Sequence, residues 1–200
     1  MNLVCLDLEG VLVPEIWIAF AEESGIEGLK KTTRDEPDYD KLMNYRLDLL
    51  REAKLGLPEI QECIAKIDPM EGAKEFLDAL RRITQVVIIS DTFEQFAAPL
   101  MAKLGFPTIF CNELIVDEAT GAITGYKMRC ENTKLTTVRA FHTAGIETIA
   151  AGDSFNDIAM IEDSKAGFFF RTTEQIARDH PDIPAFETYD ELLAAIRQAL

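Results

Sequence analysis

The chain has 200 residues, of which 48% are hydrophobic, so it can bury one full core and a modest insertion. Its formal net charge of -15 argues against a nucleic-acid or anionic-membrane partner, because phosphate groups are bound mainly by clustered Lys and Arg. The first residues contain neither a basic segment nor a long apolar one, so we expect neither a signal peptide nor a membrane span. The four cysteines form no Cys-x-x-Cys pair, so we expect free thiols in a reducing cytoplasm.

Short apolar runs that end in turn residues predict buried strands, and the first of them, residues 3–8, leads through Asp7 into Gly10. Further strands of this kind are predicted at residues 85–90, 107–111, 148–153 and 166–170. Apolar residues three or four positions apart predict helices at residues 72–82, 94–104, 133–143, 155–162 and 189–200. This alternation predicts an α/β fold with a doubly wound parallel sheet, in which ligands bind outside the carboxyl ends of the strands.

Two segments interrupt the alternation. Residues 14–69 contain no strand-like run but several amphipathic stretches, so we predict a helical cap inserted after the first strand. Residues 113–116 and 123–128 flank a turn with Thr120 and Gly121, which predicts a small β-hairpin. The predicted domains are therefore a core of residues 1–13 and 70–200 and a cap of residues 14–69.

Asp7 and Glu9 lie on either side of the bend that follows the first strand. Two acids at this spacing can flank one phosphorus atom, with Asp7 attacking it and Glu9 protonating the leaving oxygen. Taken alone, an Asp at this place is more often a turn or helix cap.

A second acidic cluster stands at another strand end, in the run Gly-Asp-Ser-Phe-Asn-Asp of residues 152–157. Oxygen ligands of this type suit Mg²⁺, so we predict Asp153 as a direct ligand and Asp157 as a residue that supports it from outside the coordination shell. The alternative is an ordinary N-terminal helix cap.

Ser90 ends the second strand and can bind phosphate oxygens together with backbone N–H groups, although a capping serine would look the same. Lys134 opens the helix before the Gly152 strand and can place a cation beside a phosphoryl group. With Mg²⁺, Lys134 balances the charge of Asp7, Asp153 and Asp157, which the anionic substrate requires.

In this order and spacing, Asp-x-Glu-Gly-Val, Ser90, Lys134 and Gly-Asp-Ser-x-Asn-Asp resemble the four signature motifs of the haloacid dehalogenase superfamily. The insertion after the first motif resembles its phosphoserine phosphatase branch. Typical members of that branch carry Asp where Glu9 stands and Ser-Gly-Gly where Ser-Asp-Thr stands. Here the chain is similar to a bacterial subgroup of phosphoserine:homoserine phosphotransferases. The extra methylene of Glu9 moves the acid by about 1.5 Å, and we hypothesise that this favours transfer to homoserine.

The resemblance implies a function and a set of residues. It implies Mg²⁺-dependent hydrolysis of O-phospho-L-serine through an aspartyl-phosphate on Asp7, with phosphoryl transfer to L-homoserine and Glu9 as proton donor. It implies that Asp7, the Glu9 main-chain carbonyl and Asp153 hold Mg²⁺. The residues that it implies in substrate contact are Glu15, Arg46, Ser90, Asp91, Lys134 and Asn156. It leaves the oligomeric state open, with a homodimer as one option.

Glu15 and Arg46 also make physical sense in this role, because an acid and a bidentate guanidinium can read the amino and carboxylate groups of an amino acid. A phosphatase for another small phosphomonoester would share all four motifs without needing this pair. A receiver-like phosphorylation module also combines a phosphorylatable Asp with a Ser or Thr and a Lys. The large insertion after Asp7 and the acids of residues 153–157 argue against that module.

Overall fold

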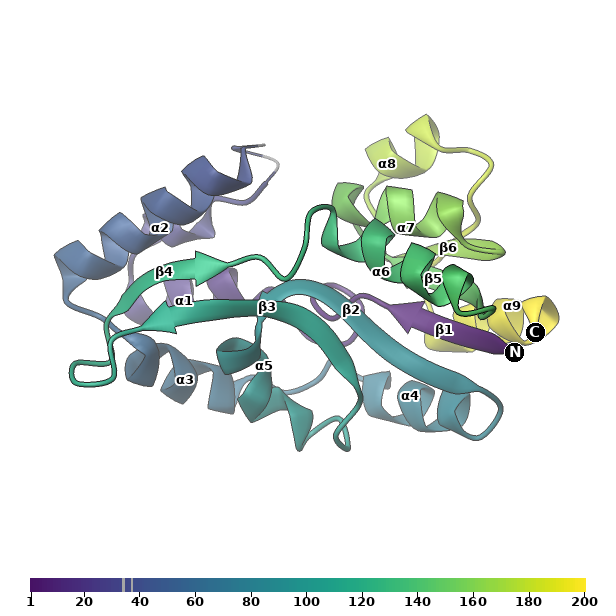
Figure 1. Cartoon of the computed structure of the whole chain (residues 1–200), viewed down its shortest axis with the longest axis horizontal. Helices are drawn as coiled ribbons and strands as arrows, with labels where there is room; N and C mark the ends of the chain where they lie inside the picture. The colour runs from purple at the N-terminus through teal and green to yellow at the C-terminus, as the bar shows by residue number, and fades with distance from the viewer. Residues whose placement is uncertain (34, 37) are drawn as a thin grey trace.

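A computed structural model describes residues 1–33, 35–36 and 38–200, so Arg34 and Pro37 of the predicted cap lie outside the described residues. Its centre is a seven-stranded sheet with the order β4-β3-β2-β1-β5-β6-β7, in which only β4 runs antiparallel to its neighbour (Figure 1). The strands are β1 Asn2–Leu6, β2 Gln85–Phe93, β3 Ile109–Val116, β4 Ile123–Lys127, β5 Glu147–Gly152, β6 Ala166–Phe170 and β7 Ala185–Phe186. The predicted doubly wound parallel sheet is confirmed.

Helices cover both faces of this sheet, as the side-chain alternation of β1 requires. Val4 and Leu6 belong to one buried cluster, whereas Leu3 and Cys5 belong to another on the opposite face. The core helices are α4 Ala73–Arg81, α5 Glu94–Met101, α6 Thr133–Thr143, α7 Ile158–Asp163, α8 Glu174–Asp179 and α9 Tyr189–Ala199. A short 3₁₀ turn, η2 Phe155–Asp157, leads into α7.

The insertion between β1 and α4 is helical, as predicted, over the part of it that the structure describes. It contains α1 Ile16–Ser24, η1 Glu27–Lys30, α2 Tyr39–Ala53 and α3 Leu57–Lys66. Trp17 of α1 packs edge-on against Phe96 of α5, with ring centroids 5.3 Å apart, so the insertion shares its apolar core with one face of the sheet. The N–H of Leu57 donates to the carbonyl of Gly121 at 2.9 Å and ties α3 to the β3–β4 turn. The division of the chain into two domains stays a prediction.

The predicted strand 107–111 and the first hairpin strand 113–116 form one continuous strand, β3. Its first half pairs with β2 and its second half with β4. Asn112 is polar, yet it is 1% exposed because its side chain donates to the carbonyl of Asp91 at 3.1 Å and accepts from the N–H of Arg129 at 3.0 Å. These long-range bonds allow a polar residue inside a strand, and the sequence pattern does not reveal them. The pattern also gave no sign of β7 or α8.

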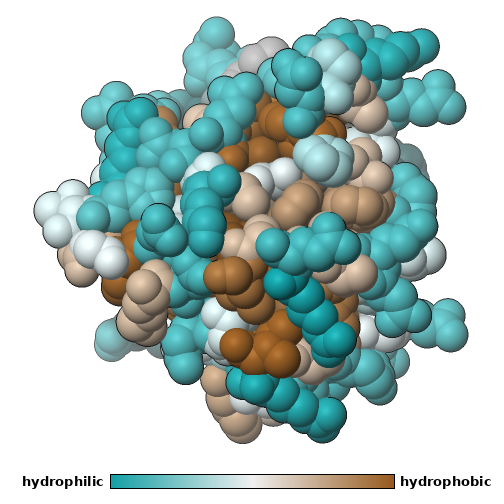
Figure 2. All heavy atoms as spheres, turned by 90° about the vertical axis from the view of Figure 1, so that its right-hand side faces the viewer, coloured by the Kyte–Doolittle hydropathy of each residue, from teal (hydrophilic) through white to brown (hydrophobic). Residues whose placement is uncertain are grey.

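Both chain termini lie at the amino end of β1 (Figure 1). The side chain of Asn2 donates to the carbonyl of Leu200 at 2.7 Å and joins them. Figure 2 looks at this side of the molecule, where apolar side chains gather in the middle of the face and hydrophilic ones surround them. In the described part of the chain, no helix combines the length and the apolar character needed to cross a bilayer.

Candidate active site

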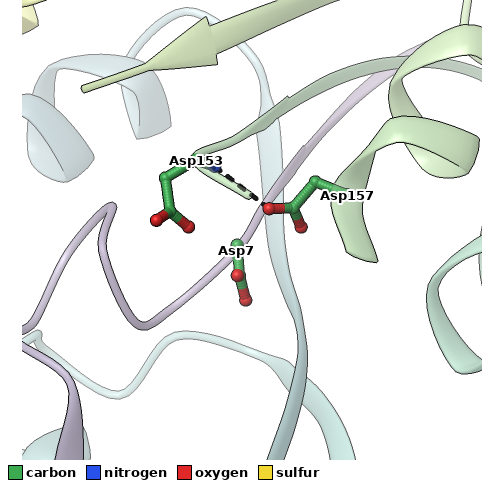
Figure 3. Close-up of side chains that lie close together, drawn as sticks. All are labelled: Asp7, Asp153 and Asp157. Atoms are coloured by element: carbon green, nitrogen blue, oxygen red, sulfur yellow. Dashed lines mark hydrogen bonds between the residues drawn. The ribbon is translucent and has the colours of Figure 1, made fainter. Parts of the chain in front are cut away.

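The carboxyl ends of three neighbouring strands bring together residues that are far apart in the sequence. Because β1 lies between β2 and β5, the residues at these three strand ends meet at one edge of the sheet. Asp7 follows β1, Ser90 lies in the last part of β2, and Asp153 follows β5. All three are buried, and Figure 3 shows Asp7 beside Asp153 and Asp157.

Asp7, Asp153 and Asp157 form a compact acidic cluster. Each of them offers one carboxylate oxygen, and these oxygens lie within 4.8 Å of one another. Asp157 accepts hydrogen bonds from the N–H groups of Asp153 and Ser154, both at 3.0 Å, which fixes its orientation. Gly10 has φ +75°, and a Cβ there would lie 2.4 Å from Cγ of Asp153. The glycine after the first motif therefore provides both the turn and the space that the carboxylate occupies.

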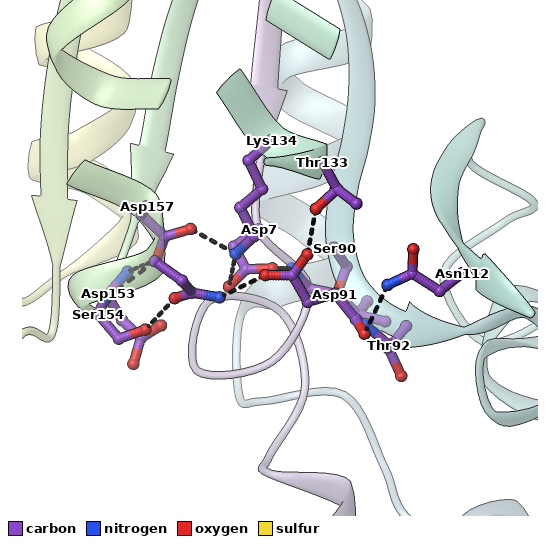
Figure 4. Close-up of polar contacts among 12 residues, drawn as sticks. Asp7, Ser90, Asp91, Thr92, Asn112, Thr133, Lys134, Asp153, Ser154 and Asp157 are labelled. Atoms are coloured by element: carbon purple, nitrogen blue, oxygen red, sulfur yellow. Dashed lines mark hydrogen bonds and ion pairs between the residues drawn. The ribbon is translucent and has the colours of Figure 1, made fainter. Parts of the chain in front are cut away.

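Lys134 inserts its ammonium into this cluster and is 3% exposed. Its Nζ lies 2.8 Å from Oδ2 of Asp7 and 2.6 Å from Oδ1 of Asp157 (Figure 4). Burial raises the pKa of Asp7 well above its ordinary value; Lys134 opposes this rise, and Asp157 and Asp153 add to it. Although burial works against it, the two carboxylates raise the pKa of Lys134 well above its ordinary value, so it stays a cation.

The residues of this cluster fit a divalent metal ion. Three buried carboxylates gather there, and the Lys134 ammonium pairs with two of them, Asp7 and Asp157. Carboxylate oxygens within one small space are the ligands that Mg²⁺ prefers.

Glu9 lies beside this cluster, towards the helical insertion. Its Oε2 accepts a hydrogen bond from the N–H of Ile16 at 2.9 Å. Burial, followed by the charge of Glu15, raises the pKa of Glu9 to about 7, while the Ile16 N–H, Thr92 and Arg46 oppose the rise. A carboxyl group with such a pKa can both donate and accept a proton near neutral pH.

Asp91 connects the sheet, helix α6, the η2 turn and the insertion. Its Oδ1 accepts from the hydroxyl of Thr133, and its Oδ2 accepts from Nδ2 of Asn156 at 2.9 Å. Its main-chain carbonyl accepts from Nδ2 of Asn112 (Figure 4). The same carbonyl accepts from the hydroxyl of Tyr39 at 3.4 Å. Both carboxylate oxygens of Asp91 therefore already have partners within the protein.

Arg46 brings a buried cation from α2 towards Glu9. It is 7% exposed, its guanidinium stacks 4.6 Å from the ring centroid of Trp17, and its Nη2 donates to the carbonyl of Lys31 at 2.8 Å. Its Nε has no hydrogen-bond partner. Glu15 precedes α1 with an exposed side chain, and its charge acts on both Glu9 and Arg46. An acid and an incompletely paired guanidinium thus face the same carboxyl group.

The model of the haloacid dehalogenase-like hydrolases matches residues 11–162, which is more than half of the chain. The chain belongs to this family. ThrH, a phosphoserine phosphatase from Pseudomonas aeruginosa, is 52% identical over 96% of this chain and 93% of its own length. A phosphoserine phosphatase from Methanocaldococcus jannaschii is 31% identical over 83% of this chain and 82% of its own length. The predicted resemblance to this family and its phosphoserine phosphatase branch is confirmed.

Solved structures agree with this family assignment. A substrate-bound complex of phosphoserine phosphatase superposes with a TM-score of 0.78 at 26% identity, over 96% of this chain and 97% of the other. A phospho-aspartyl intermediate analogue of phosphoserine phosphatase has a TM-score of 0.76 at the same 26% identity and the same coverage of 96% and 97%.

The family motifs led to most of the residues at this site, but four neighbours were missed. Asp7, Lys134, Asp153 and Asp157 form the central cluster, and Ser90 lies at the end of the neighbouring strand β2. Asp91 and Asn156 are joined by a hydrogen bond, and the charges of Glu15 and Arg46 act on Glu9. The missed residues are Tyr39, Thr92, Asn112 and Thr133. Thr92 and Thr133 adjoin predicted site residues and could have been suspected, whereas Tyr39 and Asn112 carry no local signal.

Proposed function

We propose that this hydrolase is a Mg²⁺-dependent phosphoserine phosphatase that works through an aspartyl-phosphate on Asp7 and also transfers the phosphoryl group to homoserine. The observation that carries the proposal is the burial of the Asp7 carboxylate against Lys134, within the Asp153 and Asp157 cluster. Relatives that are phosphoserine phosphatases support the substrate.

In the first step a carboxylate oxygen of Asp7 forms a bond to phosphorus, and the bond from phosphorus to the serine oxygen breaks. Glu9 gives its proton to that departing oxygen, which its pKa of about 7 allows near neutral pH. In the second step the hydroxyl of water or homoserine loses its proton to Glu9 and bonds to phosphorus, and the Asp7 carboxylate is released. Lys134 offsets negative charge on Asp7 and on the phosphoryl oxygens throughout.

Asp7, the main-chain carbonyl of Glu9 and Asp153 would hold Mg²⁺, and Asp157 would keep Asp153 and Lys134 in place through its hydrogen bonds. When bound, the metal polarises phosphoryl oxygens and offsets their charge. Ser90, Lys134 and Asn156 would contact the phosphate. Asp91, with both carboxylate oxygens engaged, would act by holding Asn156 and Thr133 in position.

Residues 14–69 would act as a cap over the core formed by residues 1–13 and 70–200. The support is that Tyr39 and Arg46, both on α2, reach Asp91 and the surroundings of Glu9. Such a cap would shield the aspartyl-phosphate from bulk water. The four free thiols support our expectation of a cytoplasmic location. A homodimer stays a prediction.

A product assay tests the proposal. With Mg²⁺ and phosphoserine alone, we expect equal amounts of serine and inorganic phosphate. With added homoserine, we expect serine to exceed phosphate by the amount of phosphohomoserine formed. Absence of serine in both samples would overturn the phosphatase function, whereas equal serine and phosphate in both would remove only the transfer to homoserine.

Replacing Arg46 by Lys should raise KM for phosphoserine about 10- to 100-fold, because Lys cannot form the bidentate fork that a carboxylate accepts. KM for phosphoethanolamine, which lacks the carboxylate, should change no more than about threefold. Arg51→Lys, an exposed substitution on the same helix, is the matched control. An equal rise of KM for both substrates would mean that Arg46 only supports the structure, and would favour a phosphatase for another small phosphomonoester.

A further inference from the structure

Among the described residues, two buried side-chain polar atoms lack a hydrogen-bond partner: Nε of Arg46 and Oγ1 of Thr92. Both side chains border Glu9, Arg46 from the helical insertion and Thr92 from the end of β2. Thr92 is 6% exposed. Its hydroxyl lies near enough to Glu9 to oppose the rise of that residue's pKa, but it makes no hydrogen bond of normal geometry there. Buried hydroxyl groups normally have partners, so this one points to a missing ligand atom.

Thr92 lies close to Ser90 at the buried end of β2. Ser90 and Thr92 are buried and Asp91 between them is half-buried, in a stretch where the pairing of β2 with β3 is irregular. Oγ of Ser90 accepts from the N–H of Thr92 at 3.3 Å. This bond holds the backbone of Thr92 against the Ser90 side chain, at the strand end that contributes to the site.

The proposed reaction brings an alcohol oxygen close to Glu9, where the Thr92 hydroxyl lies. In an in-line displacement the alcohol oxygen lies opposite the attacking Asp7 oxygen, and that alcohol oxygen exchanges a proton with Glu9. A threonine hydroxyl beside Glu9 can donate one hydrogen bond and accept another. It can therefore hold an alcohol oxygen whose other neighbour is the Glu9 carboxyl group.

We propose that Thr92 is a specificity-determining residue that binds the hydroxyl oxygen of an amino-acid alcohol, both when it leaves and when it attacks the aspartyl-phosphate. The unpartnered Nε of Arg46, a residue whose charge also acts on Glu9, fits the carboxylate of the same molecule. The ligand class is thus an α-amino acid with a side-chain hydroxyl. This inference rests on the proposed function and adds to it a reason why an alcohol competes with water.

Exchange of labelled serine into phosphoserine tests this role directly. A labelled serine hydroxyl attacks the aspartyl-phosphate, gives its proton to Glu9 and releases Asp7, so the label enters phosphoserine, whereas attack by water releases phosphate. The ratio of exchange to hydrolysis compares the two acceptors within one enzyme. Thr92→Val keeps the shape of the side chain but removes the hydroxyl. We expect it to lower the ratio about 5- to 10-fold, as the loss of one hydrogen bond predicts. Thr92→Ser should keep the ratio within about twofold of the unmodified enzyme.

Thr148→Val is the matched control, since Thr148 is also a buried threonine but bonds to His142 and Ser164. It should leave the ratio unchanged. An unchanged ratio in Thr92→Val would overturn the role of Thr92, as would an unmodified enzyme that releases phosphate without any exchange. Failure of the unmodified enzyme to release phosphate from phosphoserine would instead overturn the proposed function. Partial unfolding of a sample lowers exchange and hydrolysis to the same extent, so it does not alter their ratio.

Discussion

Asp7→Asn is expected to lower phosphoserine turnover by about 10⁴-fold or more, because an amide cannot form the covalent bond to phosphorus. The same change should leave the protein at least as stable at pH 7. Burial raises the pKa of Asp7 in the folded state above its unfolded value, so the stability that this group contributes is lost as pH rises through the folded pKa. At neutral pH, which is above the unfolded pKa, burying this carboxyl group is therefore a cost of folding that Asn lacks. Steady-state kinetics and urea unfolding measure the two effects.

Asp182→Asn is a suitable control, since Asp182 is exposed and does not belong to the acidic cluster. It should change neither activity nor stability. Phosphoserine that is labelled in its phosphoryl group should leave an acid-stable label on the unmodified protein during turnover. It should leave none on Asp7→Asn. Turnover that survives in Asp7→Asn would show that another group is phosphorylated and would remove the proposed mechanism.

Much of the fold was predictable because its signals are local. The apolar period of residues 133–143 and the apolar run of residues 166–170 coincide with α6 and β6. The course of β3 was not predictable, because Asn112 is tolerated inside it only through bonds to Asp91 and Arg129. Such bonds join residues far apart in the chain, so the spacing of apolar residues does not reveal them.

The same limit applies to the site. The carboxyl ends of parallel strands meet, so the gathering of Asp7, Ser90 and Asp153 follows from the predicted sheet. The contribution of the helical insertion to the site does not follow from the predicted sheet. The contact of Tyr39 with Asp91 depends on how the helices of the insertion pack against the core. The unpartnered atoms of Arg46 and Thr92 can be recognised only once every neighbouring group is in place.

Lys134→Met is expected to cost about 3 to 5 kcal/mol of unfolding free energy, because it leaves the buried carboxylates of Asp7 and Asp157 without their cation. Activity should fall at least about 10²- to 10³-fold, the loss typical of one group that stabilises developing charge. Stability should recover partly as pH falls. Without the ammonium the folded-state pKa of Asp7 rises further above its unfolded value, so the variant gains stability when protons bind.

Urea unfolding of Lys134→Met at pH 7.5 and 5.5, with and without Mg²⁺, separates these contributions. We expect Mg²⁺ to stabilise the variant, because a divalent ion bound among Asp7, Asp153 and Asp157 replaces the lost positive charge. Lys127→Met removes an exposed lysine that lies 3.8 Å from Glu113, and it should change stability little at either pH. A Lys134→Met protein as stable as the Lys127→Met control, with no response to pH, would mean that the three carboxylates do not repel one another in the folded chain. The electrostatic basis for placing both the metal ion and the nucleophile at this edge of the sheet would then be lost.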